Sequence, residues 1–309
     1  ARFAGANLLA YFPPEHSVAV LLRFDRLRGT EWEAAAEALI HPMPDYELIG
    51  TSDGAVGDFF DSITIATTDP NDVIATTLVG RSARRPDEVR DLLDAPTAPV
   101  EWVPARGGAH GKRTITSRMQ AGDPRALLTP FPGWFVLTLP EHLGPLLEPG
   151  TGSLDAARAS AEDLPDWLAR VRTIEDESGT DRGPALMLTL DEAIDDIDLP
   201  GIFEAPAPQR ITMALVIDPK GFRVSGSLRF TDEAEATTFV AAAERFRDTF
   251  AATHIGKAML KKANAYNAVA GLTLKQGGAR VAYGTSISTA DARVILADGA
   301  AFPGAEGRL

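Results

Sequence analysis

The order of β-rich runs and turns is the feature that most constrains the fold of this chain. In the first half, residues 62–68 and 73–80 are two β-branched and apolar runs joined by an Asp-Pro turn, in which proline presets the backbone. In the second half, residues 211–217 and 222–230 flank a second Asp-Pro turn in the same way. Each pair of runs therefore predicts a hairpin of two antiparallel strands.

Helices are predicted between these β-rich runs. After a strand at 17–24, Thr30 and Glu33 have the spacing of a capping box, which predicts a helix through Ile40. After the second hairpin, Thr231 is the expected cap of a long helix. The apolar residues of that helix recur at helical spacing, as one buried stripe formed by Phe239, Ala243, Phe246 and Phe250.

Further strands and helices complete both halves. The first half adds a short helix that begins at Pro86, and strands at 100–105 and 113–119 on either side of a glycine-rich loop, 106–112. A further strand at 134–139 runs into a helix at Pro140. The second half adds a strand at 185–190, helices at 191–197 and 255–269, a hairpin of 272–275 with 280–287, and a closing helix capped by Ser288 or Thr289.

Both halves thus follow the order strand, helix, hairpin, helix, hairpin, helix, with corresponding elements roughly 145 to 170 residues apart. Hairpins alternating with helices predict an α+β fold of two topologically similar halves, each an antiparallel sheet with helices on one face, produced by internal duplication. The expected domains are an N-terminal α+β repeat at 1–149, a helical linker at 150–184 and a C-terminal α+β repeat at 185–309. The pattern is compatible with two separate sheets and with one continuous sheet.

The composition excludes several classes of function. Acidic residues outnumber basic ones by 43 to 30, and the net charge of −13 disfavours nucleic acid as a partner. The chain has no cysteine, which excludes disulfides, thiolate metal sites and cysteine nucleophiles. No apolar run is long enough to span a bilayer as a helix, so no transmembrane segment is expected. A start at Ala1 is compatible with a removed leader, and export is the expectation.

One motif points to hydrolysis. Gly50-Thr-Ser-Asp-Gly matches the G-x-S-x-G pattern of a nucleophile elbow, with Ser52 as the nucleophile. However, the preceding run is short and half polar, bulky Asp53 follows the serine, and no glycine-rich oxyanion segment lies upstream. A surface turn is the preferred interpretation.

No metal site or cofactor is expected. The acidic run from Asp191 to Asp198 fails as an EF-hand loop, because proline occupies the fifth position when it is read from Asp196, and Ala207 the twelfth. The five histidines show no pairing at helical spacing and no H-E-x-x-H motif. A solvated helix face is the preferred interpretation of the acidic run.

Arginine-rich segments are the best candidates for binding. The loop from Arg106 to Arg113 fails the phosphate-loop pattern twice, because arginine replaces both the first glycine and the Ser or Thr. A long, mobile hairpin loop is the preferred interpretation, and the alternative is a basic patch with three arginines at 81–85 that binds an anion or an acidic partner. An aromatic turn at 130–134 is a candidate partner contact. The candidate binding residues are Arg81, Arg84, Arg85, Arg106, Lys112, Arg113, Phe131 and Trp134.

The chain also resembles a class of bacterial proteins. The opening from Phe12 to Arg28 resembles the prolines, strand and short helix that begin uncharacterised exported or lipid-anchored bacterial envelope proteins built from repeated strand and helix units. Residues 227–239 and 286–291 look like the same repeat. The resemblance implies a periplasmic or outer-membrane-associated location and brings no catalytic residues.

Three functions remain open on this basis. The first is a non-catalytic cell-envelope protein that acts by binding a protein partner or as a structural or assembly component. The second is a carrier of lipid or another apolar small molecule, because curved antiparallel sheets with helices on one face can enclose a cavity. The third is a serine hydrolase that uses Ser52.

Overall fold

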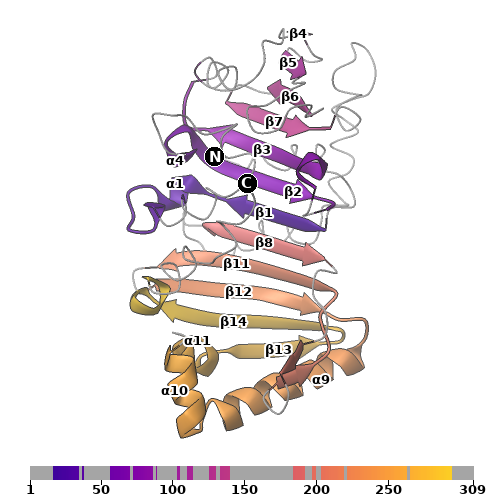
Figure 1. Cartoon of the computed structure of the whole chain (residues 1–309), viewed down its shortest axis with the longest axis vertical. Helices are drawn as coiled ribbons and strands as arrows, with labels where there is room; N and C mark the ends of the chain where they lie inside the picture. The colour runs from indigo at the N-terminus through magenta and orange to yellow at the C-terminus, as the bar shows by residue number, and fades with distance from the viewer. Residues whose placement is uncertain are drawn as a thin grey trace. The chain divides into compact units, whose positions relative to one another are not determined.

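Antiparallel β-sheets with a few helices make up the described part of the chain, so the fold is α+β (Figure 1). The computed structural model divides the chain into two compact units, Ala1–Gly179 (unit 1) and Thr180–Leu309 (unit 2). The described residues are 17–34, 37, 56–69, 72–85, 88, 103–104, 110–113, 125–129, 133–139, 184–191, 197–199, 203–218, 221–262 and 265–293. Almost all of the predicted linker at 150–184, as well as Ser52, Arg106 and Phe131, lies outside them.

The sheet of unit 1 has the strand order β1-β2-β3-β7-β6-β5-β4, and every neighbouring pair is antiparallel. Its strands are β1 (Val18–Leu22), β2 (Phe60–Thr67), β3 (Thr76–Ser82), β4 (Val103–Pro104), β5 (His110–Arg113), β6 (Ala126–Thr129) and β7 (Trp134–Thr138). Two short helices, α1 (Phe24–Leu27) and α4 (Val56–Phe59), and a 3-10 turn, η3 (Val73–Ala75), adjoin these strands.

The core of unit 1 lies on the central strands. The register pairs Leu78 of β3 with Leu137 of β7, and both side chains are fully buried. Phe60 of β2 and Phe135 of β7 are also buried, and their ring centroids are 5.0 Å apart. Phe135 is paired with Gly80, and its ring covers the glycine, where a side chain would have no room.

The sheet of unit 2 has the order β8-β11-β12-β14-β13, also antiparallel throughout. Its strands are β8 (Leu186–Asp191), β11 (Arg210–Asp218), β12 (Gly221–Arg229), β13 (Thr273–Gly277) and β14 (Arg280–Ser288), and a separate ribbon pairs β9 (Ile197–Leu199) with β10 (Phe203–Ala205). The helices are α9 (Glu233–Arg245), its π-helical continuation η6 (Phe246–Phe250), α10 (His254–Lys262) and α11 (Tyr266–Ala270).

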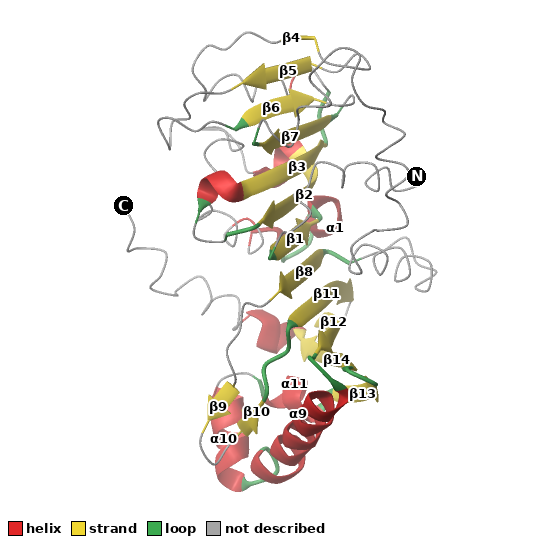
Figure 2. Ribbon diagram, turned by 90° about the vertical axis from the view of Figure 1, so that its right-hand side faces the viewer, coloured by secondary structure: helices red, strands yellow, loops and turns green. Residues whose placement is uncertain are grey.

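Aromatic contacts join α9 to the sheet and to the β9–β10 ribbon, which lies beside the helix (Figure 2). Phe230, buried at the end of β12, contacts Phe239 of α9 at a centroid distance of 5.1 Å. Phe203 of β10 also contacts Phe239, and Phe246 as well, edge to face at centroid distances of 6.0 and 5.9 Å. These contacts use two residues of the predicted apolar stripe, and edge-to-face geometry is a favoured arrangement for such ring pairs.

The structure confirms the two central hairpins and corrects several local predictions. Strand β5 begins at His110, inside the segment predicted to be a loop, so Lys112 lies in a strand. Ile197 belongs to β9, so the helix expected at 191–197 does not extend through it. Strand β6 had no counterpart among the predicted strands, because its four residues are too few to establish an alternating pattern.

Two helix caps differ from the predictions and one agrees with them. Asp232, not Thr231, caps α9 by accepting the amide hydrogen of Glu235, and the Glu235 carboxylate accepts the amide hydrogen of Thr231 in return. Near Thr30, the Glu33 carboxylate accepts the amide hydrogen of Gly29 instead of that of Thr30. Ser288 caps the helix at 289–293, as predicted, by accepting the amide hydrogen of Asp291.

The carboxylate of Asp291 predicts a pH dependence for unit 2. Hydrogen bonds donated by Asn267 (2.9 Å) and Ser288 (2.8 Å) hold its pKa below the ordinary value of 3.8. Stability from this group is complete above 3.8 and is lost as the pH falls through the lower pKa of the folded state. Asp291→Asn is expected to lower stability at pH 7, and the difference from the unmodified chain should shrink in urea titrations below pH 3.8. An unchanged difference would contradict the assignment.

No helix among the described residues has both the length and the apolar character needed to cross a membrane.

Candidate interaction site

The predicted binding residues that the structure describes lie on or next to different strands, and three of them are described with their side chains. Arg81, Arg84 and Arg85 are described with their side chains, at the end of β3 and just beyond it. The backbones of Lys112 and Arg113 lie in β5, and that of Trp134 lies in β7. The β3–β7 register makes Arg81 and Trp134 direct partners, so the sheet brings two of the predicted residues together. Lys112 and Arg113 pair with β6, farther along the sheet.

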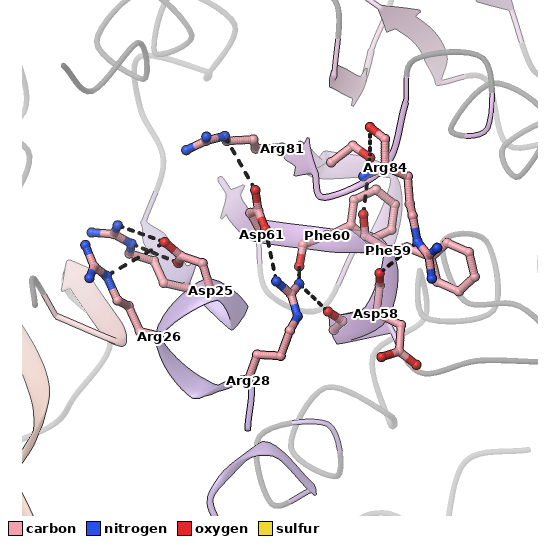
Figure 3. A network of polar contacts seen from close by, with 12 residues as sticks. Asp25, Arg26, Arg28, Asp58, Phe59, Phe60, Asp61, Arg81 and Arg84 are labelled. Carbon is pink, nitrogen blue, oxygen red and sulfur yellow. Dashed lines mark hydrogen bonds and ion pairs between the residues drawn. The ribbon is translucent and has the colours of Figure 1, made fainter. Parts of the chain in front are cut away.

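A β-bulge positions the carboxylate at the centre of the arginine cluster. In the β2–β3 pair, Phe60 is opposite Ser82 and Ser62 is opposite Arg81, so Asp61 is the extra residue on β2. A bulge bends the strand and redirects the side chain of the inserted residue. Asp61 thereby points toward two guanidinium groups, those of Arg28 and Arg81 (Figure 3).

Asp61 holds both of these arginines. Its Oδ1 lies 3.3 Å from Nη1 of Arg28, and its Oδ2 lies 3.8 Å from Nε of Arg81. Arg28 also donates to the backbone carbonyls of Gly57 (2.6 Å) and Phe60 (3.2 Å), which ties the end of α1 to α4 and β2. One carboxylate thus faces two cations, and the side chain of Arg81 keeps 48% of its surface exposed.

Arg84 is fixed by neutral groups. Its Nε donates to the carbonyl of Asp58 at 3.2 Å, and its guanidinium lies 5.4 Å from the centre of the Phe59 ring, within the range of a cation–π contact. The Ser82 hydroxyl accepts the Arg84 amide hydrogen at 2.7 Å and so shapes the turn after β3. These contacts orient an exposed guanidinium without placing a carboxylate on it.

Three further ion pairs lie in this part of unit 1. Arg85, which is 72% exposed, pairs with Glu88 at 3.1 Å, and such an exposed pair contributes little to stability. Asp25 lies between Arg23 (3.2 Å) and Arg26 (3.7 Å). The sequence between Asp72 and Asp87 has three arginines and no acid, so residues 81–85 form a local basic segment on an acidic protein.

This arrangement suits binding rather than proton transfer. Guanidinium groups remain protonated at all physiological pH values and recognise carboxylates through parallel hydrogen bonds. Within the described ranges, no group of three or more His, Asp or Glu side chains is placed to hold a metal ion. We call Arg81, Arg84 and Arg85, with the supporting Asp61 and Phe59, the arginine site.

A second exposed surface was missed at the sequence level. Helix α10 carries Ile255 and Met259, which are 70% and 53% exposed, together with the exposed lysines Lys257, Lys261 and Lys262. These three are half of the six lysines in the chain. The sequence signal that could have revealed this surface is the absence of acidic residues around it. No Asp or Glu occurs between Asp248 and Asp291.

Comparisons with known proteins give no family. No family model matches the sequence, and no curated protein matches it. Among solved structures, crystal form I of TP0453 is 10% identical with a TM-score of 0.42, covering 94% of this chain and 96% of that one. Crystal form IV of TP0453 is 10% identical with a TM-score of 0.40, covering 94% of this chain and 100% of that one.

Proposed function

We propose that this chain is a non-catalytic cell-envelope protein that binds an acidic segment of a protein partner through the arginine site. The observation that carries the proposal is the arrangement at 81–85, where Asp61 and Phe59 orient the guanidiniums of Arg81 and Arg84 while both side chains remain exposed. Binding sites gain affinity when their side chains are ordered before the partner arrives, because less conformational entropy is lost.

A carboxylate from a partner can enter this site at small cost. The Arg81–Asp61 contact is 3.8 Å long and partly exposed, and the Arg85–Glu88 pair is exposed, so neither resists an exchange of partners strongly. The guanidinium of Arg84 contacts a carbonyl and a ring, so a partner carboxylate would not displace a carboxylate there. An acidic protein segment supplies several such groups in a row.

We further propose that the two units arose by internal duplication, each an antiparallel sheet with helices on one face. Two observations support this. The strand order β1-β2-β3-β7-β6 in unit 1 corresponds to β8-β11-β12-β14-β13 in unit 2. In both, the second strand of the central hairpin has a glycine covered by an aromatic residue of the next strand: Gly80 by Phe135, and Gly226 by Tyr283. Two strands, β5 and β4, are additional in unit 1.

The location in the cell envelope rests on the resemblance of residues 12–28 to exported bacterial proteins. Cell fractionation of the intact gene product tests it. Recovery in the periplasmic or membrane fraction supports the proposal, and recovery only in the cytoplasmic fraction contradicts it.

Binding by the arginine site predicts a charge-specific loss of affinity. A fluorescein-labelled hexaglutamate peptide should bind the full chain in low salt, monitored by fluorescence polarisation. Replacing Arg81, Arg84 and Arg85 by Gln should weaken binding about tenfold, from about 0.5 kcal/mol per exposed ion pair.

The matched control replaces three exposed arginines of unit 2, Arg223, Arg229 and Arg245, by Gln and removes the same charge. Equal losses in both variants would show a net-charge effect and contradict a specific site.

A further inference from the structure

We propose that the exposed face of α10 docks onto a membrane surface of anionic lipid. The exposed side of the helix carries Ile255, Met259 and Lys262 along one edge, and Lys257 and Lys261 along the opposite edge. Among the described residues, Ile255 and Met259 are the large apolar side chains left exposed. A short helix with exposed apolar side chains and flanking lysines has the chemistry of an interfacial helix.

The packing of α10 fixes which side faces outward. Gly256 is buried, and a Cβ atom there would lie 1.9 Å from the carbonyl oxygen of Phe250, so η6 contacts this side of the helix directly. Thr253 caps the helix by accepting the Gly256 amide hydrogen at 2.9 Å and donates to the Phe250 carbonyl at 2.8 Å. Leu260, one turn after Gly256, is half-buried on the same side.

This packing explains the exposure of the two apolar side chains. Ile255 and Met259 are four residues apart and therefore lie on one stripe of the helix, beside the stripe of Gly256 and Leu260 that packs inward. Helix α10 contacts η6 and α11 (Figure 1). The exposed stripe thus belongs to a capped helix that is already packed on its inward side. A separate surface must contact the stripe to remove its apolar side chains from water.

The positive charges on the helix favour an anionic binding partner. Lys262 lies beside the stripe of Ile255 and Met259, and Lys257 and Lys261 lie on the opposite flank of the exposed side. No acidic residue occurs between Asp248 and Asp291. Asp248 itself is hydrogen-bonded to Arg247, which lowers the pKa of its carboxyl group. Lys261 lies 5.6 Å from the centre of the Tyr266 ring, which leaves its ammonium group at the surface.

An anionic bilayer fits these features better than an acidic protein does. Lysines beside apolar side chains can keep their ammonium groups at the level of the headgroups while the apolar side chains enter the acyl boundary. The rest of the chain is acidic, with a net charge of −13, so repulsion elsewhere would orient α10 toward the lipid. With two large apolar side chains, the binding should be weak, reversible and sensitive to salt.

Vesicle flotation of the full chain tests the proposal. Vesicles of phosphatidylcholine mixed with phosphatidylglycerol should carry the protein upward at low salt, and vesicles of phosphatidylcholine alone should not. Replacing Lys257, Lys261 and Lys262 by Gln should reduce partitioning on the order of a hundredfold, at about fivefold per lysine. Replacing Ile255 and Met259 by Ser should reduce it about tenfold.

The control is again the variant with Arg223, Arg229 and Arg245 replaced by Gln, which should bind the anionic vesicles as well as the unmodified chain does. All the substituted side chains are exposed, and unchanged thermal unfolding will show that the variants are folded. Equal binding to both kinds of vesicle, no binding to either, or equal losses in the lysine and control variants would overturn the proposal. So would α10 variants that keep vesicle binding but lose a protein partner.

Discussion

Replacement of Gly80 by alanine is expected to destabilise unit 1 by about 3 kcal/mol, at the upper end of the usual cost of overpacking a core. A Cβ atom at this position would lie 1.7 Å from Cε1 and 2.3 Å from Cζ of the Phe135 ring. The ring has no free space to move into, because Phe135 is fully buried and contacts the equally buried Phe60. A single added methyl group must therefore displace either a core ring or a central strand.

Tryptophan fluorescence will report the effect in unit 1. All four tryptophans of the chain, Trp32, Trp102, Trp134 and Trp167, lie within residues 1–179. The midpoint of thermal unfolding followed by tryptophan emission should fall by about 10 °C.

A double-mutant cycle identifies the ring as the cause. Phe135→Leu alone should cost about 1.5 kcal/mol from lost burial. Because leucine removes the ring that collides with the new Cβ atom, the Gly80→Ala, Phe135→Leu variant should be more stable than the sum of the two single effects predicts. Strict additivity would show that Gly80 is required for another reason.

Replacement of Gly226 by alanine is expected to destabilise unit 2 by about 3 kcal/mol or more. Gly226 lies on β12, opposite Met213 of β11 and Tyr283 of β14. A Cβ atom would lie 1.9 Å from the carbonyl oxygen of Thr212 and 2.6 Å from Cζ and Oη of Tyr283. The Tyr283 hydroxyl crosses the glycine to donate to the same carbonyl at 3.0 Å.

This second glycine should differ from the first in one respect. The nearest obstacle at Gly226 is a backbone atom, so truncating Tyr283 cannot make room, whereas truncating Phe135 can make room at Gly80. Gly226→Ala should therefore not be rescued by Tyr283→Ala. Hydrogen exchange followed by mass spectrometry should show faster exchange in β11, β12 and β14, and normal protection in those strands would contradict the prediction.

Local signals made the hairpins predictable from the sequence. Proline turns and alternating residues determine where β2 and β3, or β11 and β12, begin and end, and the structure confirms both pairs. The glycine–aromatic contacts were not predictable, because they depend on the register between Gly80 and Phe135, which are far apart in the chain. The same holds for the bulge at Asp61, which exists only relative to the partner strand.

The candidate surfaces likewise combine features that the sequence shows with features that depend on the tertiary structure. The arginines at 81–85 could be identified from composition alone, but the contacts that orient them come from Asp61 and Phe59, on a different strand and helix. The lysines of α10 were visible in the sequence, yet the exposure of Ile255 and Met259 follows from the close approach of Gly256 to η6. Exposure is a tertiary property, so helical periodicity alone would have assigned these residues to a core.

Site-specific photo-crosslinking in the native cell tests most directly the claim that the arginine site binds an acidic protein segment. A photoreactive residue replaces the exposed Ala83, between Arg81 and Arg84, and in a control chain it replaces the exposed Ala234 of α9. The proposal predicts that the residue at position 83 captures a protein whose crosslinked peptide is rich in Asp and Glu, and that replacing Arg81, Arg84 and Arg85 by Gln abolishes the product. Equal capture from position 234, or a crosslinked peptide without excess acidic residues, would contradict it.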